Sequence, residues 1–280
     1  MHEREFPFTS HDFERIRKLI YTYAGISLHA GKADMVYSRI TRRLRATGLR
    51  SFEDYLERLV SDAEEWQHFV NSLTTNLTSF FRESHHFPIL AEHVQTLHAQ
   101  TRRPLKLWSA ACSTGEEPYS MAMTMIDTFG SWSPPVRILA TDLDTNVLEQ
   151  AQAGVYSAER VERLPRDLVR RFFQRGRGAN AGMVRVNPAV RALVRFRPFN
   201  LLQTQWPMQG PFAAVFCRNV LIYFDKPTQY RLMQRLHPLL YPQGLLFVGH
   251  SESLLHAADL FRPRGQTVCI PVARPSGRTR

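Results

Sequence analysis

The stretch LWSAACSTGEEPYS at residues 107–120 decides the fold of this chain of 280 residues. An apolar run passes through small residues into an acidic helix start, which predicts a strand, a tight loop and a helix. In open α/β folds such a junction lies at the carboxyl edge of the sheet, where ligands bind. The stretch therefore indicates a site for a nucleotide-like cofactor.

The loop in this stretch lacks the residues that bind phosphates. It has neither the Gly-Lys-Ser/Thr run of a P-loop nor the spaced glycines of a dinucleotide fingerprint, only Gly115. Glu116 and Glu117 stand where a phosphate would lie, and their charge would repel it. A ligand with hydroxyls, amines or a positive charge fits better, although acidic residues also complement a helix dipole without binding a ligand.

A second predicted strand, VRILATD at 136–142, ends in an acidic residue about thirty positions after the first strand. An acidic residue at this place in a βαβ unit is suited to accept hydrogen bonds from both hydroxyls of a ribose. Asp142 is therefore the candidate ribose ligand, and Asp144 is expected to cap a helix at 145–153. A ribose without a pyrophosphate indicates S-adenosylmethionine.

The composition is that of a globular enzyme, with an ordinary hydrophobic content of 44%. A chain of this length can form one large domain plus a smaller one. No apolar run approaches the length of a membrane span, and the charged start MHEREF is followed by no apolar signal core. We therefore expect a cytoplasmic protein without membrane insertion.

The cysteines and histidines predict neither a disulfide framework nor a metal site. The cysteines are far apart and form no CxxC motif, so we expect reduced, half-buried thiols at Cys112, Cys217 and Cys269. Adjacent His85 and His86 cannot both face one metal from a helix, and no acidic ligand interleaves with them and His93. We expect packing and capping roles for these histidines.

The basic residues are unevenly distributed. With 36 Lys and Arg against 25 Asp and Glu, the formal net charge is +11, which favours polyanions or acidic protein surfaces as partners. One N-terminal stretch holds Lys32, Arg39, Arg42, Arg43, Arg45 and Arg50. A solvated helix face explains this stretch as well as a docking surface does. The last residues, 274–280, are too polar and short to fold alone, so we expect a basic, flexible tail.

The first seventy-odd residues predict a small helical unit. Apolar residues recur at helical spacing from Ser10, the expected cap, to Gly25, and again over 35–44. Further helices are predicted at 51–60 and 63–73.

From Leu105 onward, predicted strands alternate with helices, which indicates a parallel sheet with right-handed crossovers. Buried strands are predicted at 211–217 and 244–250, with a helix at 227–240 between them. Between 154 and 200 the pattern weakens into turns and two alternating stretches, MVRV and LVRFRPF. These predict a small antiparallel hairpin inserted into the main domain.

Several motifs of the chain occur together in one known family. They are NLTSFFRESHHFPIL at 76–90, LWSAACSTGEEPYS at 107–120, ATDLDTNVLEQAQAGVY at 140–156, FNLL at 199–202, VFCRNVLIYFD at 215–225 and GLLFVGHSESL at 244–254. In this combination the chain resembles the chemotaxis receptor glutamate O-methyltransferases, the CheR family, over nearly its whole length. The resemblance implies an α/β fold, that of a class I, Rossmann-like, S-adenosylmethionine-dependent methyltransferase.

The same resemblance implies how the chain is divided. We expect an N-terminal helical domain at 1–75 and a methyltransferase domain at 76–273. The weakly patterned region becomes a small antiparallel β-subdomain inserted at about 155–198, and the basic tail follows at 274–280.

The resemblance also implies the site residues. Cofactor contacts carry over to Asn76, Thr78, Arg82, Glu117, Asp142, Asn200, Leu201, Arg218 and Asn219. Glu117 rather than Glu116 is implied as the direct contact. Arg82 and Tyr223 are the candidate catalytic residues, which orient the acceptor carboxylate through single contacts; alternatively, Arg82 holds the methionine carboxylate of the cofactor.

The implied activity is transfer of a methyl group to glutamate side chains on the cytoplasmic domain of bacterial chemoreceptors, with S-adenosylhomocysteine as the second product. A glutamate with an ordinary pKa near 4.3 is already ionised at pH 7, so the reaction needs no general base. The implied partners are the receptor's cytoplasmic helices and, in some family members, its C-terminal tail, which adds as a strand to the β-subdomain. We expect a monomer that needs no metal.

Two other classes of function stay open from the residues themselves. A nucleic-acid methyltransferase would use the same cofactor, but the stretch CRNVLIY at 217–223 lacks the Asn/Asp-Pro-Pro-aromatic motif typical of enzymes that methylate amino groups. We therefore expect no nucleic-acid partner. A non-catalytic adaptor that senses S-adenosylmethionine is the other alternative.

Overall fold

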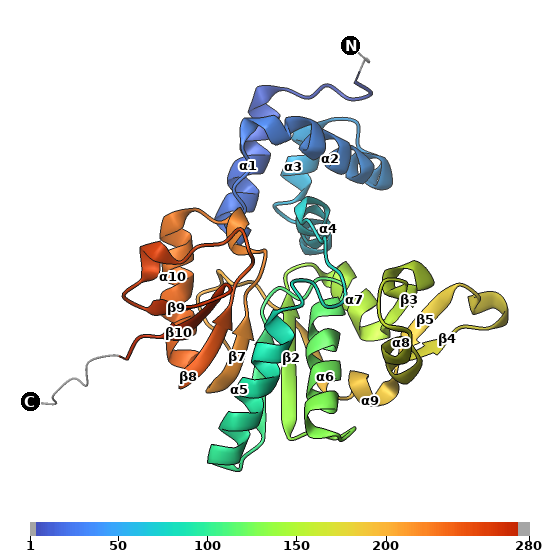
Figure 1. Ribbon diagram of the computed structural model, residues 1–280. Helices are drawn as coiled ribbons and strands as arrows, with labels where there is room; N and C mark the ends of the chain where they lie inside the picture. The colour runs from blue at the N-terminus through green and yellow to red at the C-terminus, as the bar shows by residue number, and fades with distance from the viewer. Residues whose placement is uncertain (1–3, 274–280) are drawn as a thin grey trace, which may run out of the picture.

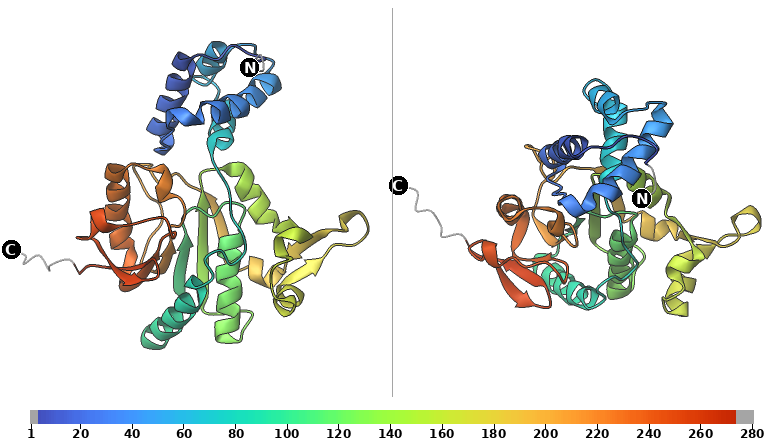
Figure 2. Two further views of the ribbon diagram at one scale, coloured as in Figure 1. Left: turned by 45° about the horizontal axis from the view of Figure 1, so that its top comes forward. Right: turned by 90° about the horizontal axis from the view of Figure 1, so that it is seen from above.

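The computed structural model describes residues 4–273, and the predicted basic tail at 274–280 lies outside these residues. A helical unit stands on a larger sheet domain, beyond one end of its strands (Figure 1). Seen from above, the helical unit covers part of the sheet domain, and a small β-subdomain projects to one side (Figure 2). Within the described residues, no helix is long and apolar enough to cross a membrane.

All the predicted N-terminal helices are present. They are α1 Ser10–Ala24, α2 Ala33–Thr47 with the 3-10 turn η1 Ala30–Lys32 before it, α3 Phe52–Arg58 and α4 Ala63–Leu73. The cap of α1 is Thr9 rather than the expected Ser10. The Thr9 hydroxyl accepts from the N–H of Asp12, and the Asp12 carboxylate accepts from the N–H of Thr9, so the two residues form a capping box. Gly25 ends α1 in the left-handed region, as predicted.

The helical unit has a core of its own. Its buried apolar side chains come from all of these helices and include Phe13, Ile16, Ile20, Val36, Ile40, Leu44, Tyr55 and Phe69. The buried carboxylate of Glu65 lies beside this core and accepts two hydrogen bonds from Arg43, at 2.9 and 2.7 Å, and one from the Tyr55 hydroxyl at 2.7 Å. Arg43 therefore belongs to the internal structure of the unit rather than to its free surface charge.

The main sheet has seven strands in the order β6-β2-β1-β7-β8-β10-β9. They are β1 Leu105–Ser109, β2 Val136–Asp142, β6 Val194–Pro198, β7 Phe212–Phe216, β8 Leu240–Phe247, β9 Phe261–Gly265 and β10 Val268–Pro271. The first five in this list run parallel, as predicted. The antiparallel hairpin of β9 and β10, which extends the sheet beyond β8, was not predicted.

In the described part of the chain, four helices cover the sheet, and all but the first of them follow a parallel strand. They are α5 His86–Thr101, α6 Glu116–Phe129, α7 Thr145–Ala153 and α10 Lys226–Leu236. Helices α5 and α6 lie side by side over the face that is turned to the viewer in Figure 1. The helix predicted at 227–240 is shorter, because its end is the 3-10 turn η5 His237–Leu239, where Pro238 has no N–H to continue the helix.

The region between α7 and β6 forms the small β-subdomain. Its elements are β3 Val155–Ser157, η2 Ala158–Val161, α8 Arg166–Phe172, β4 Phe173–Arg175, η3 Gly178–Asn180, β5 Met183–Val186 and α9 Pro188–Arg191. The strands form an antiparallel sheet in the order β3-β5-β4. An antiparallel insertion was predicted correctly, but its expected end at 198 was wrong.

The stretch Val194–Pro198 belongs to the main sheet and not to the insertion in which the sequence pattern placed it. It forms the edge strand β6, parallel to β2, with Val194 opposite Ile138. Alternating apolar and basic residues suit any strand with one buried face, since Phe196 is buried and Arg195 is exposed. The pattern therefore identified a strand without saying which sheet it joins.

The helical unit contacts the sheet domain at a few points. The Tyr21 hydroxyl donates to Asp225 (2.5 Å), and the side-chain amide of Asn200 donates to the Tyr23 carbonyl (2.7 Å). Gly25 has a left-handed backbone with φ of +68°, and a side-chain Cβ there would lie 2.4 Å from Cδ1 of Leu202, so both the backbone and the close approach favour glycine. The polypeptide then crosses between the two parts as the linker, residues 74–85 (Figure 2).

Candidate active site

A cavity of about 310 Å³ lies between the helical unit and the carboxyl ends of the parallel strands. Its lining from the sheet domain, between Ala110 and Phe224, is called the floor here, and its lining from the helical unit, between Ala24 and Arg39, is called the roof. The linker closes one side. Every residue predicted to contact the cofactor or the acceptor lines this one cavity: Asn76, Thr78, Arg82, Glu117, Asp142, Asn200, Leu201, Arg218, Asn219 and Tyr223.

The two acidic residues at the start of α6 face different surroundings. Glu117 lines the cavity, and its carboxylate accepts from the Ser109 hydroxyl (2.7 Å) and from Nε of Arg218 (2.8 Å). Glu116 is fully buried, away from the cavity, where the Thr114 hydroxyl donates to it at 2.6 Å. Burial raises the pKa of Glu116 above its ordinary value. Only one of the adjacent acids is therefore available to a ligand.

Asp142 ends β2 with its carboxylate at the cavity. One oxygen accepts from the backbone N–H of Ser113 (2.7 Å) and the other from that of Asp144 (3.0 Å), and the residue is 8% exposed. Burial raises the pKa of Asp142 to about 6, although the backbone N–H groups favour the ionised form. These contacts orient the carboxylate and leave lone pairs for hydroxyl donors of a ligand.

Asp144 has the predicted capping role and a further one. One carboxylate oxygen accepts from the N–H groups of Asn146 and Val147 in the first turn of α7. The other accepts from the Thr74 hydroxyl (2.6 Å) and the Asn76 side-chain amide (2.8 Å). The cap therefore also fastens the linker to the floor.

The linker carries Arg82 into the cavity. Its backbone is tied to α6, because the Ser120 hydroxyl accepts from the N–H of Phe81 (2.9 Å). One guanidinium nitrogen of Arg82 donates to the Leu77 carbonyl (2.8 Å), and within residues 4–273 no carboxylate lies at ion-pair distance from it. In the described part of the chain, Arg82 is thus a cation in the cavity without an anionic partner.

Arg218, which follows β7, is in the opposite situation. It is 5% exposed, and besides its bond to Glu117 it donates through one terminal nitrogen to the Arg82 carbonyl (2.7 Å) and to Nδ1 of His86 (2.9 Å). Its charge is therefore already balanced by Glu117. The next residue, Asn219, has a left-handed backbone with φ of +58° and donates its side-chain amide to Glu83 (3.3 Å).

The remaining predicted floor residues follow β6 and β7. The Asn200 amide bonds to the protein itself through the Tyr23 carbonyl and the N–H of Leu202 (2.9 Å), while Leu201 is a buried apolar neighbour. Tyr223 ends the 3-10 turn η4 Leu221–Tyr223. Asn200 therefore reaches the cavity with its amide already bonded to the helical unit.

The roof supplies residues that sequence reasoning did not place at the site. Arg39 lines the cavity and donates to the carbonyls of Ser72 (3.3 Å) and Thr74 (2.6 Å), without a carboxylate partner among residues 4–273. Burial lowers the pKa of Arg39 from its very high ordinary value. Lys32 and Met35 line the cavity with it. Lys32, Met35 and Arg39 are spaced by three and four residues, and this spacing could have indicated that they lie on one helix face.

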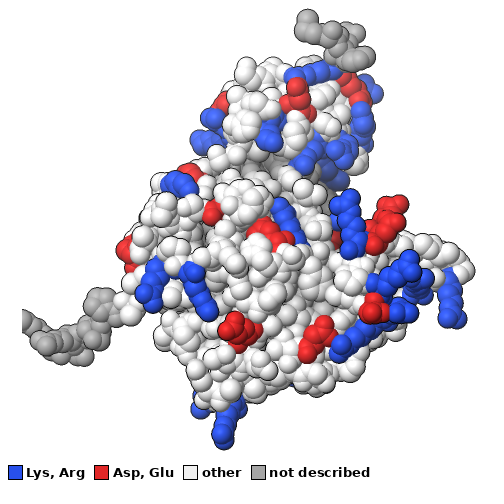
Figure 3. All heavy atoms as spheres, in the orientation of Figure 1, with Lys and Arg blue, Asp and Glu red and all other residues white. Residues whose placement is uncertain are grey.

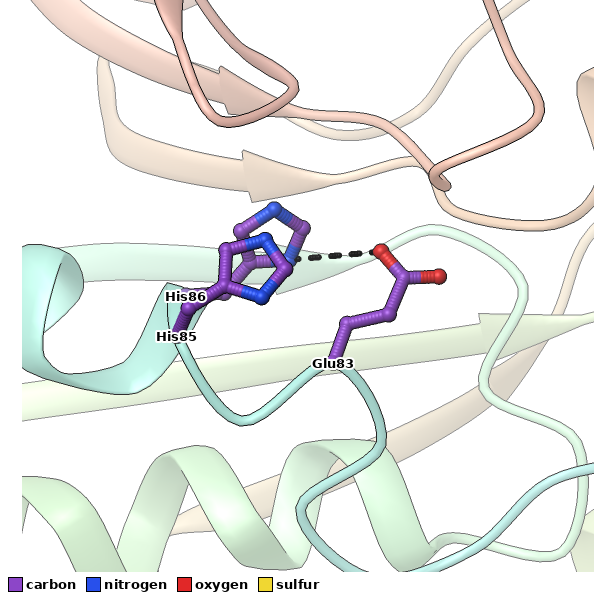
Figure 4. A group of neighbouring side chains, drawn as sticks. All are labelled: Glu83, His85 and His86. Atoms are coloured by element: carbon purple, nitrogen blue, oxygen red, sulfur yellow. Dashed lines mark ion pairs between the residues drawn. The ribbon is translucent and has the colours of Figure 1, made fainter.

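A cluster of Glu83, His85 and His86 lies beside the site (Figure 4), with ligand atoms within 4.8 Å of one another. Sequence reasoning overlooked Glu83 as an acidic neighbour of the histidines. Nδ1 of His86 accepts from Arg218, and Nε2 lies 3.0 Å from the carbonyl of Gln266. Burial, together with the charge of Arg218, lowers the pKa of His86 to about 4. The arginine cation occupies the position from which a metal would bind His86, so the cluster supports the packing role.

The thiols differ from expectation in one respect. All three are free but fully buried rather than half-buried: Cys112, Cys217 and Cys269. Burial, with the charges of Asp142 and Glu117 nearby, raises the pKa of the Cys112 thiol well above its ordinary range. A thiol that stays protonated is a poor nucleophile, so Cys112 is a packing residue of the cofactor loop.

Comparison with known proteins covers both parts of the chain. Residues 11–74 match the family model for the CheR methyltransferase all-alpha domain, and residues 76–270 match that for the CheR methyltransferase SAM binding domain. Chemotaxis protein methyltransferase 2 of Pseudomonas aeruginosa is 53% identical over 268 residues, which cover 96% of this chain and 95% of that protein. The chemotaxis protein methyltransferases of Klebsiella aerogenes and Escherichia coli are each 51% identical, covering 95% and 91% of this chain and 91% and 89% of their own lengths.

Proposed function

The chain belongs to the CheR methyltransferase family, and we propose that it methylates glutamate side chains on the cytoplasmic helices of bacterial chemoreceptors. It is an S-adenosylmethionine-dependent chemotaxis methyltransferase, so the non-catalytic adaptor is not supported. The proposed products are a glutamate methyl ester and S-adenosylhomocysteine. Since the proposed acceptors are cytoplasmic helices, we place the reaction in the cytoplasm.

The residues around the cavity fit this cofactor. Asp142 and Glu117 offer acceptors for ribose hydroxyls and for an ammonium group, and the loop before α6 has neither the glycine-rich run nor the P-loop lysine that would favour a phosphate. The apolar residues Phe199 and Leu201 line the same floor and suit an adenine ring. We therefore propose as cofactor contacts the linker and floor residues Asn76, Thr78, Arg82, Glu117, Asp142, Asn200, Leu201, Arg218 and Asn219.

The observation that supports the acidic acceptor is the contrast in charge across one cavity. The floor carboxylates face a roof and linker that hold Arg39 and Arg82, neither of which has an ion-pair partner among residues 4–273. Unpaired cations beside a cavity favour an anionic group there. A single chain builds the whole cavity, so we propose that a monomer is sufficient for activity.

The chemistry asks for alignment rather than proton transfer. S-adenosylmethionine, when bound, supplies an electrophilic sulfonium methyl group. The acceptor carboxylate is ionised at pH 7, so no side chain needs to act as a base. Positioning can supply up to roughly 7 to 11 kcal/mol of rate acceleration. We propose that Arg82 and Tyr223 perform this positioning through single contacts, since a tight bidentate clamp would stabilise the ionised acceptor before reaction and slow it.

The basic face of α2 is the proposed receptor-docking surface. Lys and Arg side chains gather over the helical unit in Figure 3. Two of the arginines of α2 are not free, because Arg43 pairs with Glu65 and Arg45 pairs with Glu5. Arg42 is exposed and pairs with no carboxylate among residues 4–273. Arg42→Glu alone is therefore a cleaner test of docking than the joint reversal of Arg42 and Arg43.

A receptor tail would need a strand edge on the β-subdomain. In the order β3-β5-β4 the outer strands are β3 and β4, and strand addition would use one of these edges. We propose this site as the place to test tail binding, separately from methyl transfer.

The proposed function is tested by incubating the chain with S-adenosylmethionine labelled in its methyl group and with a chemoreceptor cytoplasmic domain. We expect label on the receptor that is released by mild base as methanol, the behaviour of a methyl ester. The matched control is a receptor domain with glutamine at the acceptor positions, which should take up no label. Label on DNA or RNA instead would support the alternative of a nucleic-acid methyltransferase.

A further inference from the structure

The loop that follows β7 is held by one buried carboxylate that has no assigned role. Glu252 is 8% exposed and accepts hydrogen bonds from four backbone N–H groups. The donors are Asn219 (2.9 Å), Leu221 (2.8 Å), Ile222 (3.3 Å) and Gly249 (2.5 Å). The N–H of Glu252 in turn donates to the Gly249 carbonyl (2.9 Å), which closes a turn that directs the carboxylate at the loop.

Other groups hold the carbonyls of the same loop. The buried side chain of Gln229 donates to the carbonyls of Leu221 (2.8 Å) and Phe224 (3.0 Å). The Tyr223 carbonyl accepts from the N–H of Ser27 in the roof (2.9 Å). Within residues 219–224, Glu252 therefore binds three backbone N–H groups, whereas Gln229 and the N–H of Ser27 bind three backbone carbonyls.

Burying a carboxylate at this position is energetically unfavourable. Burial raises the pKa of Glu252, and the loop N–H groups lower it, whereas within residues 4–273 no ion pair balances its charge. A buried charge without a cation is unfavourable unless several hydrogen bonds satisfy it. Two oxygens with four lone-pair directions can serve four donors, which a neutral amide with one oxygen cannot do.

The loop is also strained and tightly packed where it meets this carboxylate. Asn219 adopts a left-handed backbone, which persists only when its surroundings hold it. A Cβ on Gly249 would lie 2.4 Å from Nδ2 of Asn219 and 2.9 Å from a Glu252 oxygen. The backbone at Gly249 therefore lies close against Asn219 and Glu252.

We propose that Glu252 is a positioning residue for methyl transfer, which fixes the 219–223 loop so that Asn219 and Tyr223 face the cavity. The inference rests on the proposed function, because it assigns Glu252 to the alignment of the acceptor. It acts through the loop backbone and lines no part of the cavity itself.

The test is Glu252→Gln in the full chain. The glutamine keeps the shape but places an amide NH₂ against loop donors, so we expect kcat with a receptor cytoplasmic domain to fall about 10- to 100-fold. The KM for the receptor should change less than about threefold, and affinity for S-adenosylmethionine should fall less than kcat does, since Asn219 is one cofactor contact among several; this is the signature of lost alignment rather than lost binding. Hydrogen exchange of the amides of Asn219, Leu221 and Ile222 should become faster.

The matched control is Glu65→Gln, the same change at a buried carboxylate of the helical unit. It should lower the melting temperature while keeping kcat within about twofold and the loop exchange unchanged. Equal loss of kcat in both variants, or unchanged kcat and loop exchange in folded Glu252→Gln, would overturn the inference. If Glu252→Gln does not fold, Glu252→Asp keeps the charge on a shorter arm, and the same readouts decide.

Failure of the proposed function has a different signature. In that case the wild-type chain transfers no methyl group to a receptor, whereas hydrogen exchange still reports whether Glu252 holds the loop. Unchanged exchange in the variant counts against Glu252 whatever the acceptor is.

Discussion

The floor and the roof of the cavity are built in opposite ways. The floor presents Glu117 and Asp142, each bonded at both oxygens by groups of the sheet domain and almost fully buried. Within residues 4–273 the roof presents Lys32 and Arg39 but no carboxylate, and the bonds of the Arg39 guanidinium go to carbonyls. The floor, with its tightly bonded carboxylates, suits a cofactor that is the same in every turnover. The basic roof suits an acidic protein substrate. Under the proposed function, the acidic floor would bind the cofactor and the basic roof would recognise the acceptor, so charge would separate the two tasks within one cavity.

The largest effect is expected when the buried ion pair of the helical unit is broken. Arg43→Ala leaves the buried Glu65 carboxylate without its cation, and breaking such a pair lowers the free energy of unfolding by about 3 to 5 kcal/mol. Denaturant unfolding followed by circular dichroism measures this loss. The matched variant Arg42→Ala, at an exposed position of the same helix, should change the free energy of unfolding by no more than about 0.5 kcal/mol. Equal losses in both variants would show that the ion pair is not the cause.

The next largest effect is expected at the linker. Arg82→Ala removes from the cavity a cation that has no carboxylate partner among residues 4–273, and losing one charge-assisted hydrogen bond lowers kcat/KM by up to about 100-fold. A weaker affinity for S-adenosylmethionine with normal turnover at saturating cofactor would mean that Arg82 binds the cofactor. Normal affinity with low turnover would assign it to the acceptor. If affinity and turnover both stay at wild-type values, neither role stands.

A smaller effect on cofactor affinity is expected when the pH is lowered, because Asp142 in the floor becomes protonated. Asp142 has a pKa raised to about 6, so it is ionised at pH 7 and gains a proton as the pH falls through 6. The protonated form is a weaker acceptor for ligand hydroxyls, so affinity for S-adenosylmethionine should fall by up to about tenfold between pH 7 and pH 5. Calorimetric titration at several pH values across this range measures this affinity. Asp142→Asn should bind weakly and with little dependence on pH over the same range; a steep dependence in that variant would assign the titration to another group.

The smallest effect is expected on the outer face of the helical unit. Arg42→Glu should raise the KM for a receptor cytoplasmic domain about two- to fivefold at low salt, because an exposed charge mainly steers association. Cofactor affinity should stay unchanged, since Arg42 does not line the cavity. The difference from wild type should disappear at high salt. A salt-independent loss would mean that Arg42 contacts the receptor in some other way.

Several features of the site were predictable from short stretches because they are local. Asp144 precedes a helix start and caps it, and Asp142 ends a buried strand, so their positions relative to the backbone follow from the sequence around them. The resemblance supplied the more distant members of the cavity, from Asn76 to Tyr223, and they line one cavity in the structure. Their assigned roles remain predictions.

Other features depend on contacts between distant residues and were wrong or missed. The stretch Val194–Pro198 reads equally well as a strand of either sheet, and only pairing with β2 decides between them. The arginines of α2 look alike in sequence, yet Arg43 meets Glu65 while Arg39 reaches the cavity. Helix periodicity gives the face on which a side chain lies but not what packs against that face.

The sequence by itself determined the alternation of strands and helices, the loop without a phosphate site and the acidic end of β2, because each depends on residues close together in the chain. It also contained the motifs that identify the family. The tertiary structure alone decided that Glu116 is buried away from the cavity, that Glu117 balances Arg218 while Arg82 has no carboxylate partner within residues 4–273, and that Glu252 reaches back to the loop after β7. The physical reason is that burial and hydrogen-bond partners, which set the charge and orientation of a side chain, come from segments far apart in sequence.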